Sequence, residues 1–458
     1  MSLISALQTA STAMEVFSSA LGVDQTNVAN ASTAGYSALN ANIQPIDLSG
    51  DGTNTNDYLS VTSTDSAFAD ASVRAASSQA SASSTAAQQL SPVNSLFDIT
   101  GQTGILAAFQ QFSTAFANLS VTPNDPTLGA AALAAAGNVA SAFQTTAAGL
   151  ESQQAQTDSS IQSTVSQINT LTSQIAQLNV QAAGASQSQT NPGIQANLSS
   201  DLDQLSSLVD INVTTNATTG AVSVLAGGEL PLVLGDQSYA LSANPAAAAG
   251  SQITSATGGN SPVSFSGQLG GLLQVQNGTL SPLLAPTGST GSLNTLASGF
   301  ATAVNSLLTS GVTTAGAPGV ALFDISDPVN AASTLTVDHA VTASDLGLGT
   351  ATESNGIANQ LAALPASTAA GLSAEGLFGS IAASVGQSLS DANTQSTADQ
   401  TTLTSAQANR TQISGVSLDQ EAVNITAYQR AYDASAQVVS ILDQLTSIEV
   451  GLLNGNTQ

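Results

Sequence analysis

The sequence predicts an α+β protein with a discontinuous helical stalk, built from both chain ends, and a β-rich middle domain. Apolar residues recur at helical spacing near both ends, whereas residues 186–350 contain short runs that alternate apolar and polar side chains. Hydrophobic residues make up 42% of the chain but aromatic residues only 3%, so we expect many small contacts between close-packed helices. This order of elements lets the two ends of the chain run side by side.

Residues 1–60 are expected to form the N-terminal helix of the stalk and a turn. Apolar positions in the first part of this region are spaced alternately four and three residues apart, which is the seam pattern of a coiled coil. We assign these seam residues to an assembly interface: Leu3, Leu7, Met14, Phe17 and Leu21.

Residues 61–185 are expected to form a helical rod region. Residues 105–119 and 128–143 predict two helices, with a turn at residues 122–126 between them. Residues 161–178 predict a further amphipathic helix, because apolar side chains face one way while Gln and Ser fill most other positions.

Residues 186–350 are expected to form the β-rich middle domain with an internal helix. Val209, Ile211 and Val213 alternate with polar residues, as do Val222 and Val224, and this alternation predicts a β-hairpin. Further strands are predicted at residues 230–234, 239–241 and 335–337, glycine breaks at residues 258–259 and 270–271, and a helix at residues 293–308. The pattern does not place this helix in the stalk or in the β-region.

Residues 351–458 are expected to return as helices and to end in a C-terminal assembly helix. The alternating spacing resumes from Ala427, and its large apolar residues complete the predicted assembly interface: Val438, Ile441, Leu445, Ile448 and Leu452. Two isolated seams bury little surface alone, so each needs the other or a neighbouring subunit. The spacing does not distinguish a seam between subunits from a stripe that covers an intramolecular core.

The charge of the chain excludes two classes of partner. Arg74, Arg410 and Arg430 stand against 29 acidic residues, there is no lysine, and the formal net charge is −26. Nucleic acids and anionic lipids both attract proteins through lysine and arginine, so neither is an expected partner. No stretch reaches about 18 consecutive apolar residues, which argues against membrane insertion. Because so few positive charges would repel one another after protonation of the carboxylates, we hypothesise acidic surroundings.

The chain lacks the residues that most catalytic and metal sites need. It has no cysteine, and its single histidine, His339, is predicted to be a surface residue. We find no nucleophile elbow and no P-loop. Asp201 and Asp203 diverge on a predicted helix and are expected to solvate it. Residues 51–57 place oxygen side chains at alternate positions, but a calcium loop that starts at Asp51 would lack its glycine at the sixth position and its glutamate at the twelfth, so a solvated turn is expected. We therefore predict no enzymatic activity, no cofactor and no metal site.

Two segments carry a more specific signal. Asn27, Asn30, Thr33, Gly35 and Tyr36 resemble the Asn-x-x-Asn-x-x-Thr-x-Gly-Tyr signature of flagellar rod, hook and hook-associated proteins. A second set resembles the C-terminal signature of the flagellar hook-associated protein 1 (FlgK) family: Ser414, Gly415, Leu418, Asp419, Glu421, Tyr428, Gln429 and Tyr432. Paired at opposite ends of one chain, the two signatures are a strong signal for this family, and the middle of the chain resembles it more loosely but in the same order.

Local physical chemistry agrees with the second signature, and the chain also departs from the family. Ser417 and Gln420 form a potential capping box, which predicts that a helix begins at Leu418. FlgK-like proteins usually carry an arginine after their long helix, but residues 201–205 have none, so the salt bridge of that arginine is expected to be absent. The chain is also shorter than many relatives, which suggests a reduced outer insertion domain.

The resemblance implies a structural subunit of the flagellar hook–filament junction, outside the cell, that polymerises through its terminal helices. It also implies export through the flagellar type III apparatus, since the first residues do not resemble a secretory signal peptide. The implied partners are further copies in a ring, hook protein, other hook-associated proteins, and an export chaperone on the C-terminal region. Two alternatives stay open: another flagellar axial protein (hook-associated protein 3 or flagellin), and a Ser/Thr-rich adhesin secreted without a signal. Subunit number, exact neighbours and ligand binding by the middle domain also stay open.

Overall fold

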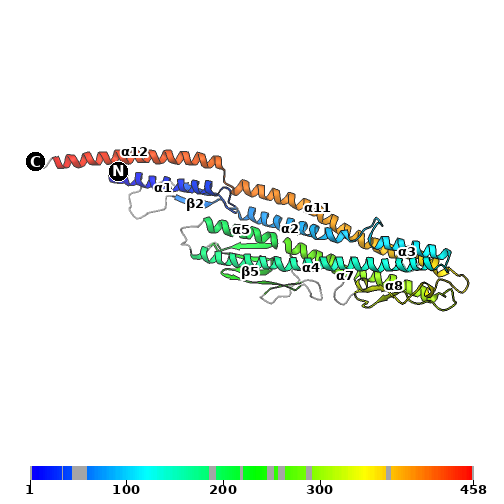
Figure 1. The fold of residues 1–458 in the computed structure, drawn as a ribbon. Coiled ribbons are helices and arrows are strands. Elements are labelled where there is room, and N and C mark those ends of the chain that lie inside the picture. The colour runs from blue at the N-terminus through cyan, green and yellow to red at the C-terminus, as the bar shows by residue number, and fades with distance from the viewer. Residues whose placement is uncertain are drawn as a thin grey trace.

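The computed structural model describes residues 3–33, 35–43, 59–184, 192–216, 220–244, 252–255, 264–284, 291–367 and 373–455. These residues form an elongated molecule of long helices, and the terminal helices α1 (Leu3–Asn30) and α12 (Leu418–Gly455) lie at the same end (Figure 1). The predicted α+β arrangement, with helices from both chain ends and a middle region that contains strands, is confirmed.

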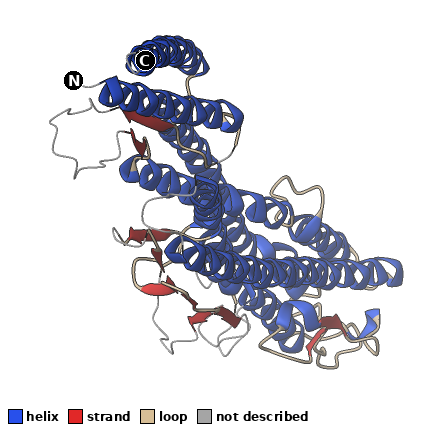
Figure 2. Ribbon diagram, turned by 90° about the vertical axis from the view of Figure 1, so that its left-hand side faces the viewer, coloured by secondary structure: helices blue, strands red, loops and turns tan. Residues whose placement is uncertain are grey.

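The stalk consists of α1 and α12, which contact each other and run antiparallel (Figures 1 and 2). An antiparallel hairpin of β1 (Leu39–Ile43) and β2 (Leu59–Ser63) lies against α1, with Leu39 opposite Ser63. One helix pair therefore carries both ends of the described chain.

The rod begins where α2 (Ala67–Ser95) and α11 (Ala374–Ser414) pack along each other. Beyond them, α3 (Gly104–Val121) packs against α4 (Pro126–Gly184). Aromatic rings pack between α3, α4 and α8 (Ser292–Ser310), a helix at the end of the molecule opposite the stalk. The ring centroid of Phe109 lies 4.8 Å from that of Phe300 and 5.9 Å from that of Phe143.

Helix α4 spans 59 residues and joins two helices that the sequence predicts separately. Buried positions continue between them at Leu150, Gln153 and Thr157. Gln153 Nε2 donates to Gln89 Oε1 of α2 at 2.7 Å, and Thr157 Oγ1 donates to the carbonyl of Gln153 at 2.9 Å. Polar contacts thus continue the buried face through a stretch where hydrophobic periodicity lapses.

Helix α4 also contains the one window in the described residues that is long and apolar enough to cross a membrane. Its small apolar side chains, among them Ala132, Ala136 and Val139, are buried in the core that α4 shares with α3. In the folded chain α4 is therefore a core helix.

The middle of the chain holds α5 (Pro192–Leu208) and an antiparallel sheet in the order β3-β4-β5-β6. Its strands are β3 (Ile211–Thr215), β4 (Val222–Ala226), β5 (Leu230–Leu234) and β6 (Gln237–Ser238). The hairpin and the strand at residues 230–234 are confirmed. The predicted strand at residues 239–241 is wrong in its bounds, because β6 ends before it and a separate hairpin of β7 (Leu241–Asn244) and β8 (Gln252–Ser255) begins at its last residue.

The far end of the rod contains α8 (Ser292–Ser310), which confirms the predicted helix at residues 293–308 and packs against α11, away from the stalk (Figure 1). The predicted strand at residues 335–337 is confirmed as β10. The other elements between the sheet and α11 are α6 (Gly267–Val275), a π-helical turn (Gln276–Leu280), α7 (Ser281–Leu284), β9 (Phe323–Ile325), α9 (Ala331–Thr334), β10 (Leu335–Val337), α10 (Gly356–Ala363) and two 3-10 turns (Ala343–Asp345 and Leu364–Ala366).

The part of the molecule outside the stalk, from α2 to α11, is called the body. Asparagine side chains in the body tie helices to extended segments. Asn179 of α4 donates to the carbonyl of Val222 and accepts from its N–H, both at 2.8 Å. Asn169 makes the same pair of hydrogen bonds with Leu241, at 2.9 and 2.8 Å. Asn305 of α8 does so with Phe323, at 2.8 Å each. Each amide supplies both a donor and an acceptor, so it satisfies a backbone N–H and C=O as a neighbouring strand would.

Glycines 270 and 271 lie inside α6, so the predicted break between strands is wrong at this point. A Cβ atom on Gly271 would collide with the carbonyl oxygen of Ala82 in α2. The missing side chain therefore allows α6 to pack closely on α2. The other predicted break, at residues 258–259, lies outside the described residues.

We expect Gly271→Ala to lower the free energy of unfolding by about 1–3 kcal/mol, because the added methyl group forces α6 away from α2. The matched control is Gly299→Ala, at an exposed position in α8 with no atom near the new Cβ. It should raise the free energy of unfolding by up to about 1 kcal/mol, because alanine favours helix over glycine. Urea unfolding of both variants measures these two opposite changes in stability. If Gly271→Ala did not lose stability, the close packing of α6 on α2 would be contradicted.

Candidate assembly interface

The N-terminal signature builds the joint between α1 and β1. Asn27 is fully buried in α1, and its Oδ1 accepts hydrogen bonds from the N–H of Leu39 and the hydroxyl of Tyr36, both at 2.8 Å. Its Nδ2 donates to the carbonyl of Leu39 at 2.8 Å. Asn27 thus pairs with the first residue of β1 as another strand residue would, and it fixes the strand on α1.

The turn after α1 depends on three further residues of this signature. Thr33 donates to Asn30 twice, from its N–H to the carbonyl at 2.8 Å and from Oγ1 to Oδ1 at 3.2 Å. Gly35 has φ of +76°, and a Cβ there would lie 2.7 Å from the carbonyl oxygen of Ala196 in α5. Both the left-handed backbone and the close approach to α5 require glycine. The signature therefore sets the direction in which the chain leaves α1.

Ser414 closes the joint from the C-terminal side. Its carbonyl accepts from the N–H of Ala38 at 2.9 Å, and its Oγ donates to the carbonyl of Thr64 at 3.0 Å. Ser414 and Thr64 are 350 residues apart in sequence. At Gly415, the next residue, a Cβ would collide with the carbonyl of Thr411. The end of α11 is thereby joined to both strands of the N-terminal hairpin.

Helix α12 begins at Leu418, as predicted. Ser417 Oγ accepts a hydrogen bond from the N–H of Gln420 at 3.4 Å. The side-chain Nε2 of Gln420 donates to Asn424 Oδ1, one turn further on, at 2.9 Å. Only the first half of the predicted capping box therefore forms, because the glutamine side chain has a competing partner. Asp419 and Gln429 are exposed on this helix.

The N-terminal seam packs partly within the chain. Phe17 of α1 stacks on Tyr428 of α12, with ring centroids 6.4 Å apart and an interplanar angle of 28°. Tyr432 is half-buried on α12. The other described seam residues are half-buried on α1: Leu7, Met14 and Leu21. The side chain of Leu3 lies outside the described residues.

The C-terminal seam lies on another face of the stalk. Its described residues are exposed to 47%, 57%, 47% and 60%, in the order Val438, Ile441, Leu445 and Ile448. We call these four residues the C-terminal stripe. Val439 and Leu442 are half-buried instead, so a neighbouring row of α12 contacts α1. The side chain of Leu452 lies outside the described residues.

A shallow apolar groove runs between α1 and α12 beside the C-terminal stripe. We call it the alanine groove, and its lining residues are Ala6, Thr9, Ala10, Ala13, Ala434, Ser435 and Val438. Its walls are made mostly of small side chains, which leave room for larger ones from outside. Val438 belongs to both the groove and the stripe, so the two surfaces are continuous.

Two carboxyl groups meet where α1 crosses the start of α12. Asp24 is only 3% exposed and Glu421 only 7%. Burial, together with the neighbouring Glu421 carboxyl, raises the pKa of Asp24 to about 6. Burial raises the pKa of the Tyr36 and Tyr428 hydroxyls, and the negative charge of Glu421 adds to the shift at Tyr36, as Asp24 and Glu421 do at Tyr428.

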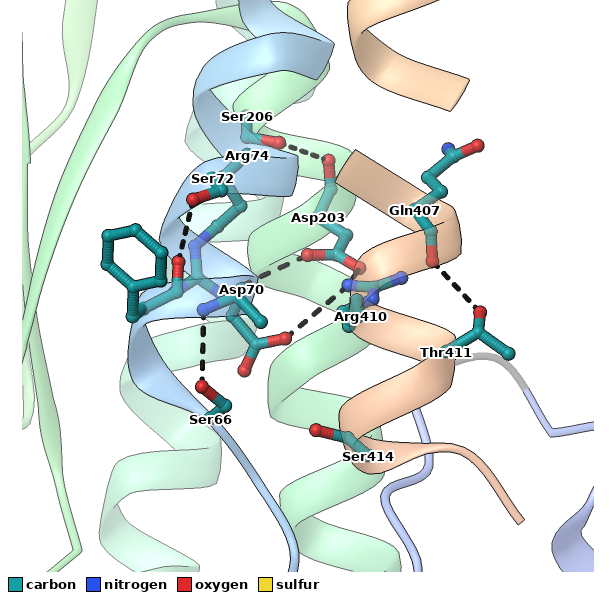
Figure 3. A network of polar contacts seen from close by, with 12 residues as sticks. Ser66, Asp70, Ser72, Arg74, Asp203, Ser206, Gln407, Arg410, Thr411 and Ser414 are labelled. Carbon is teal, nitrogen blue, oxygen red and sulfur yellow. Dashed lines mark hydrogen bonds and ion pairs between the residues drawn. The ribbon is translucent and has the colours of Figure 1, made fainter. Parts of the chain in front are cut away.

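A second polar cluster, which we call the body cluster, joins helices of the body just beyond the joint (Figure 3). It consists of Asp70, Arg74, Asp203 and Arg410. Arg410 of α11 donates to Asp203 Oδ2 of α5 at 2.6 Å, and its Nη1 lies 3.7 Å from Asp70 Oδ1 of α2. Arg74 Nη1 lies 3.9 Å from Asp203 Oδ1. Burial and the neighbouring Asp65 raise the pKa of Asp70 to about 7, against the lowering effect of the two arginines. Three helices from distant parts of the chain meet at this cluster.

Our prediction that Asp203 solvates its helix is wrong. The arginines that reach it come from α2 and α11, and residue spacing within α5 cannot reveal partners so distant in sequence. They also supply a salt bridge at the segment where the family arginine is missing. One sequence signal did exist: two of the three basic residues in the chain, Arg74 and Arg410, gather here.

The described residues contain no group of three or more His, Cys, Asp or Glu side chains that could hold a metal ion. His339 is exposed after β10, as predicted. Residues 51–57, whose pattern falls short of a calcium loop, lie outside the described residues.

The model of the helical domain of the flagellar hook-associated protein FlgK matches residues 63–323, which is more than half of the chain. The chain belongs to the FlgK family. Residues 407–448 also match the C-terminal model of the flagellar basal body rod FlgEFG proteins, and this match includes most of α12. The FlgK-family assignment therefore rests on the part of the chain from α2 through the middle sheet to α8, and a flagellar match at the C-terminal end accompanies it.

Two individual relatives accompany the family match. Flagellar hook-associated protein 1 of Bacillus subtilis (strain 168) is 26% identical over 494 aligned positions, which cover 96% of each chain. The solved structure of the flagellar hook junction protein FlgK from Burkholderia pseudomallei is 29% identical with a TM-score of 0.49, and the match covers 56% of this chain and 46% of that chain.

We expect Arg410→Met to lower the free energy of unfolding by about 1–3 kcal/mol, because it leaves the partly buried Asp203 and Asp70 without their shared cation. Arg430→Met is the matched control, since Arg430 is exposed on α12, and its effect should stay within about 0.5 kcal/mol. Chemical denaturation of the two variants measures the difference. Equal effects would show that the cluster does not stabilise the body.

Proposed function

We propose that this chain is a non-enzymatic structural subunit of the hook–filament junction of a bacterial flagellum and that it polymerises through its terminal helices. Membership of the FlgK family supports the flagellar role. The observation that carries the assembly role is the C-terminal stripe, a row of large apolar side chains that stays exposed although α1 and α12 already pack together.

The exposed stripe provides a driving force for association. Complete burial of a Val, Leu or Ile side chain stabilises a protein by about 1.5–3 kcal/mol. The four stripe residues are already about half covered, so their burial in a neighbour contributes on the order of several kcal/mol per contact. An aliphatic row of this length is unusual on a surface made mostly of small polar residues, and such rows mark interaction sites.

We propose a second copy of this chain as the occupant of the alanine groove. Large side chains of one C-terminal stripe match the small-walled groove of the next copy, and the two surfaces adjoin at Val438. A contact between two different surfaces leaves each subunit with one free stripe and one free groove. Repetition of such a contact closes into a ring or continues as a helix, which is the geometry that a flagellar junction needs.

The other proposed partners follow from the same role. They are hook protein and other hook-associated proteins as neighbours in the axial structure, and a chaperone that covers the C-terminal region before export through the flagellar type III apparatus. The assembled site is extracellular. On this proposal the joint built by Asn27, Gly35 and Ser414 is structural: it sets the angle at which the stalk leaves the body.

We expect Leu445→Asp to abolish junction assembly and motility, because it places a carboxylate in a contact that excludes water, at a cost on the order of several kcal/mol. The isolated variant should keep its melting transition, because Leu445 is 47% exposed in the free chain. Electron microscopy of flagella and swimming of cells that carry only the variant give the measurement, and bare hooks are the expected result.

Ser440→Asp is the control, because it adds the same charge to an exposed position of α12 outside the stripe. It should assemble and support swimming. Normal assembly of Leu445→Asp would remove the stripe from the interface and favour the adhesin alternative. Unfolding of the isolated variant would instead assign the stripe to the core of the chain.

A further inference from the structure

The carboxyl groups of Asp24 and Glu421 form no ion pair with any arginine of the described residues. Each belongs to a different stalk helix, and each keeps one buried oxygen, Asp24 Oδ2 and Glu421 Oε2, without a hydrogen-bond partner in the described residues. Two ionised carboxylates in this position would repel each other and would also leave two buried acceptors unpaired. A single proton between them removes both penalties, because a protonated carboxyl group donates to an ionised one.

Within the described residues no other group donates a hydrogen bond to Asp24 Oδ2 or Glu421 Oε2. The Tyr36 hydroxyl already donates to Asn27, and Tyr428 of α12 stacks on Phe17. In addition to burial, the negative charge of Glu421 raises the pKa of Tyr36, and Asp24 and Glu421 together raise the pKa of Tyr428, so neither tyrosine supplies a positive charge to the pair. Of the arginines, Arg74 and Arg410 are bound to the aspartates of the body cluster, and Arg430 is exposed on α12.

We propose that one proton shared by Asp24 and Glu421 fastens α1 to α12, so that the stalk is closed in acidic surroundings and loosens as the pH rises to neutral. The direction follows from proton binding. The pKa of Asp24 is raised from 3.8 to about 6, so the folded stalk binds a proton more tightly than the unfolded chain does. Stability of the stalk therefore falls as the pH rises from about 4 to about 6 and then stays at its lower value.

This device acts on the site of the proposed function, and its place in assembly rests on that proposal. A stalk that is loose at the neutral pH of a cytoplasm and closed in an acidic exterior presents the C-terminal stripe and the alanine groove in fixed relative positions only after export. Closure itself concerns the single chain, so it can be measured without any assembly.

The experiment measures the separation of α1 and α12 in the full-length monomer. The chain has no cysteine, so Ser19→Cys and Gln429→Cys, both exposed, accept one spin label each. Distance distributions between the labels are recorded by pulsed electron paramagnetic resonance from about pH 4 to about pH 8. A narrow distribution at the acidic end, a broad one at the neutral end and most of the change between about pH 4 and about pH 6 are expected.

The variant Glu421→Gln separates this pair from Asp70, which also titrates near neutrality but lies in the body cluster. The amide of Gln can donate to Asp24 at every pH, so this variant should give the narrow distribution over the whole pH range. Asp24→Asn places an amide that can donate to Glu421, and it should give the same result. Asp433→Asn is the control, because it removes one exposed charge from α12 and should keep the pH dependence.

Three results would overturn the proposal. The first is a narrow distribution of the parent chain at both ends of the pH range. The second is that Glu421→Gln and Asp24→Asn keep the pH dependence, or give a broad distance distribution at every pH. The third is closure of the parent chain near pH 8 by millimolar calcium, which would make the pair a cation site instead of a proton site.

Discussion

The ion pair between Arg410 and Asp203 lies at the point where the first, middle and last parts of the chain meet, and the position of the stalk depends on it. Arg410 belongs to α11, four residues before Ser414, whose carbonyl and hydroxyl bind the N-terminal hairpin. Asp203 belongs to α5, against which Gly35 packs. A displacement of α11 along α2 would therefore move both the joint and the start of α12. A chain with three basic residues uses two of them here.

The two halves of the molecule differ in what stabilises them. The body encloses large buried side chains such as Phe112, Phe116 and Leu205. The stalk has few such side chains. On α1 the described apolar residues that are buried are Ala10, Val16 and Ala20, and most of the described positions of α12 remain exposed. A helix pair of this kind gains much of its stability from contacts outside itself. Because α1 and α12 bury little apolar surface between them, the stability of the stalk depends both on contacts with a neighbouring subunit and on the proton proposed between Asp24 and Glu421.

Local signals in the sequence predicted local structure well. The start of α12 follows from Ser417, and the hairpin of β3 and β4 follows from alternating valines, because both are set by residues close in sequence. Contacts between distant segments escaped prediction. The polar residues that continue α4, the glycine that lets α6 approach α2, and the partners of Asp203 all depend on a second element. The seam spacing predicted a helix at each end but not which row of α12 contacts α1, and the division into four regions stays a prediction.

The asparagines that tie helices to strands give the body a property that the stalk lacks. Asn169, Asn179 and Asn305 hold their strands with uncharged amides, which neither gain nor lose a proton at any pH that a protein survives. A carboxylate at these positions could accept from the backbone N–H but would need a proton to donate to the carbonyl. Acidic and neutral solutions therefore leave these asparagine hydrogen bonds unchanged, so titration of a buried group near neutral pH in the described part of the body is confined to the cluster around Asp70, while the helices and strands that carry the stalk keep their connections.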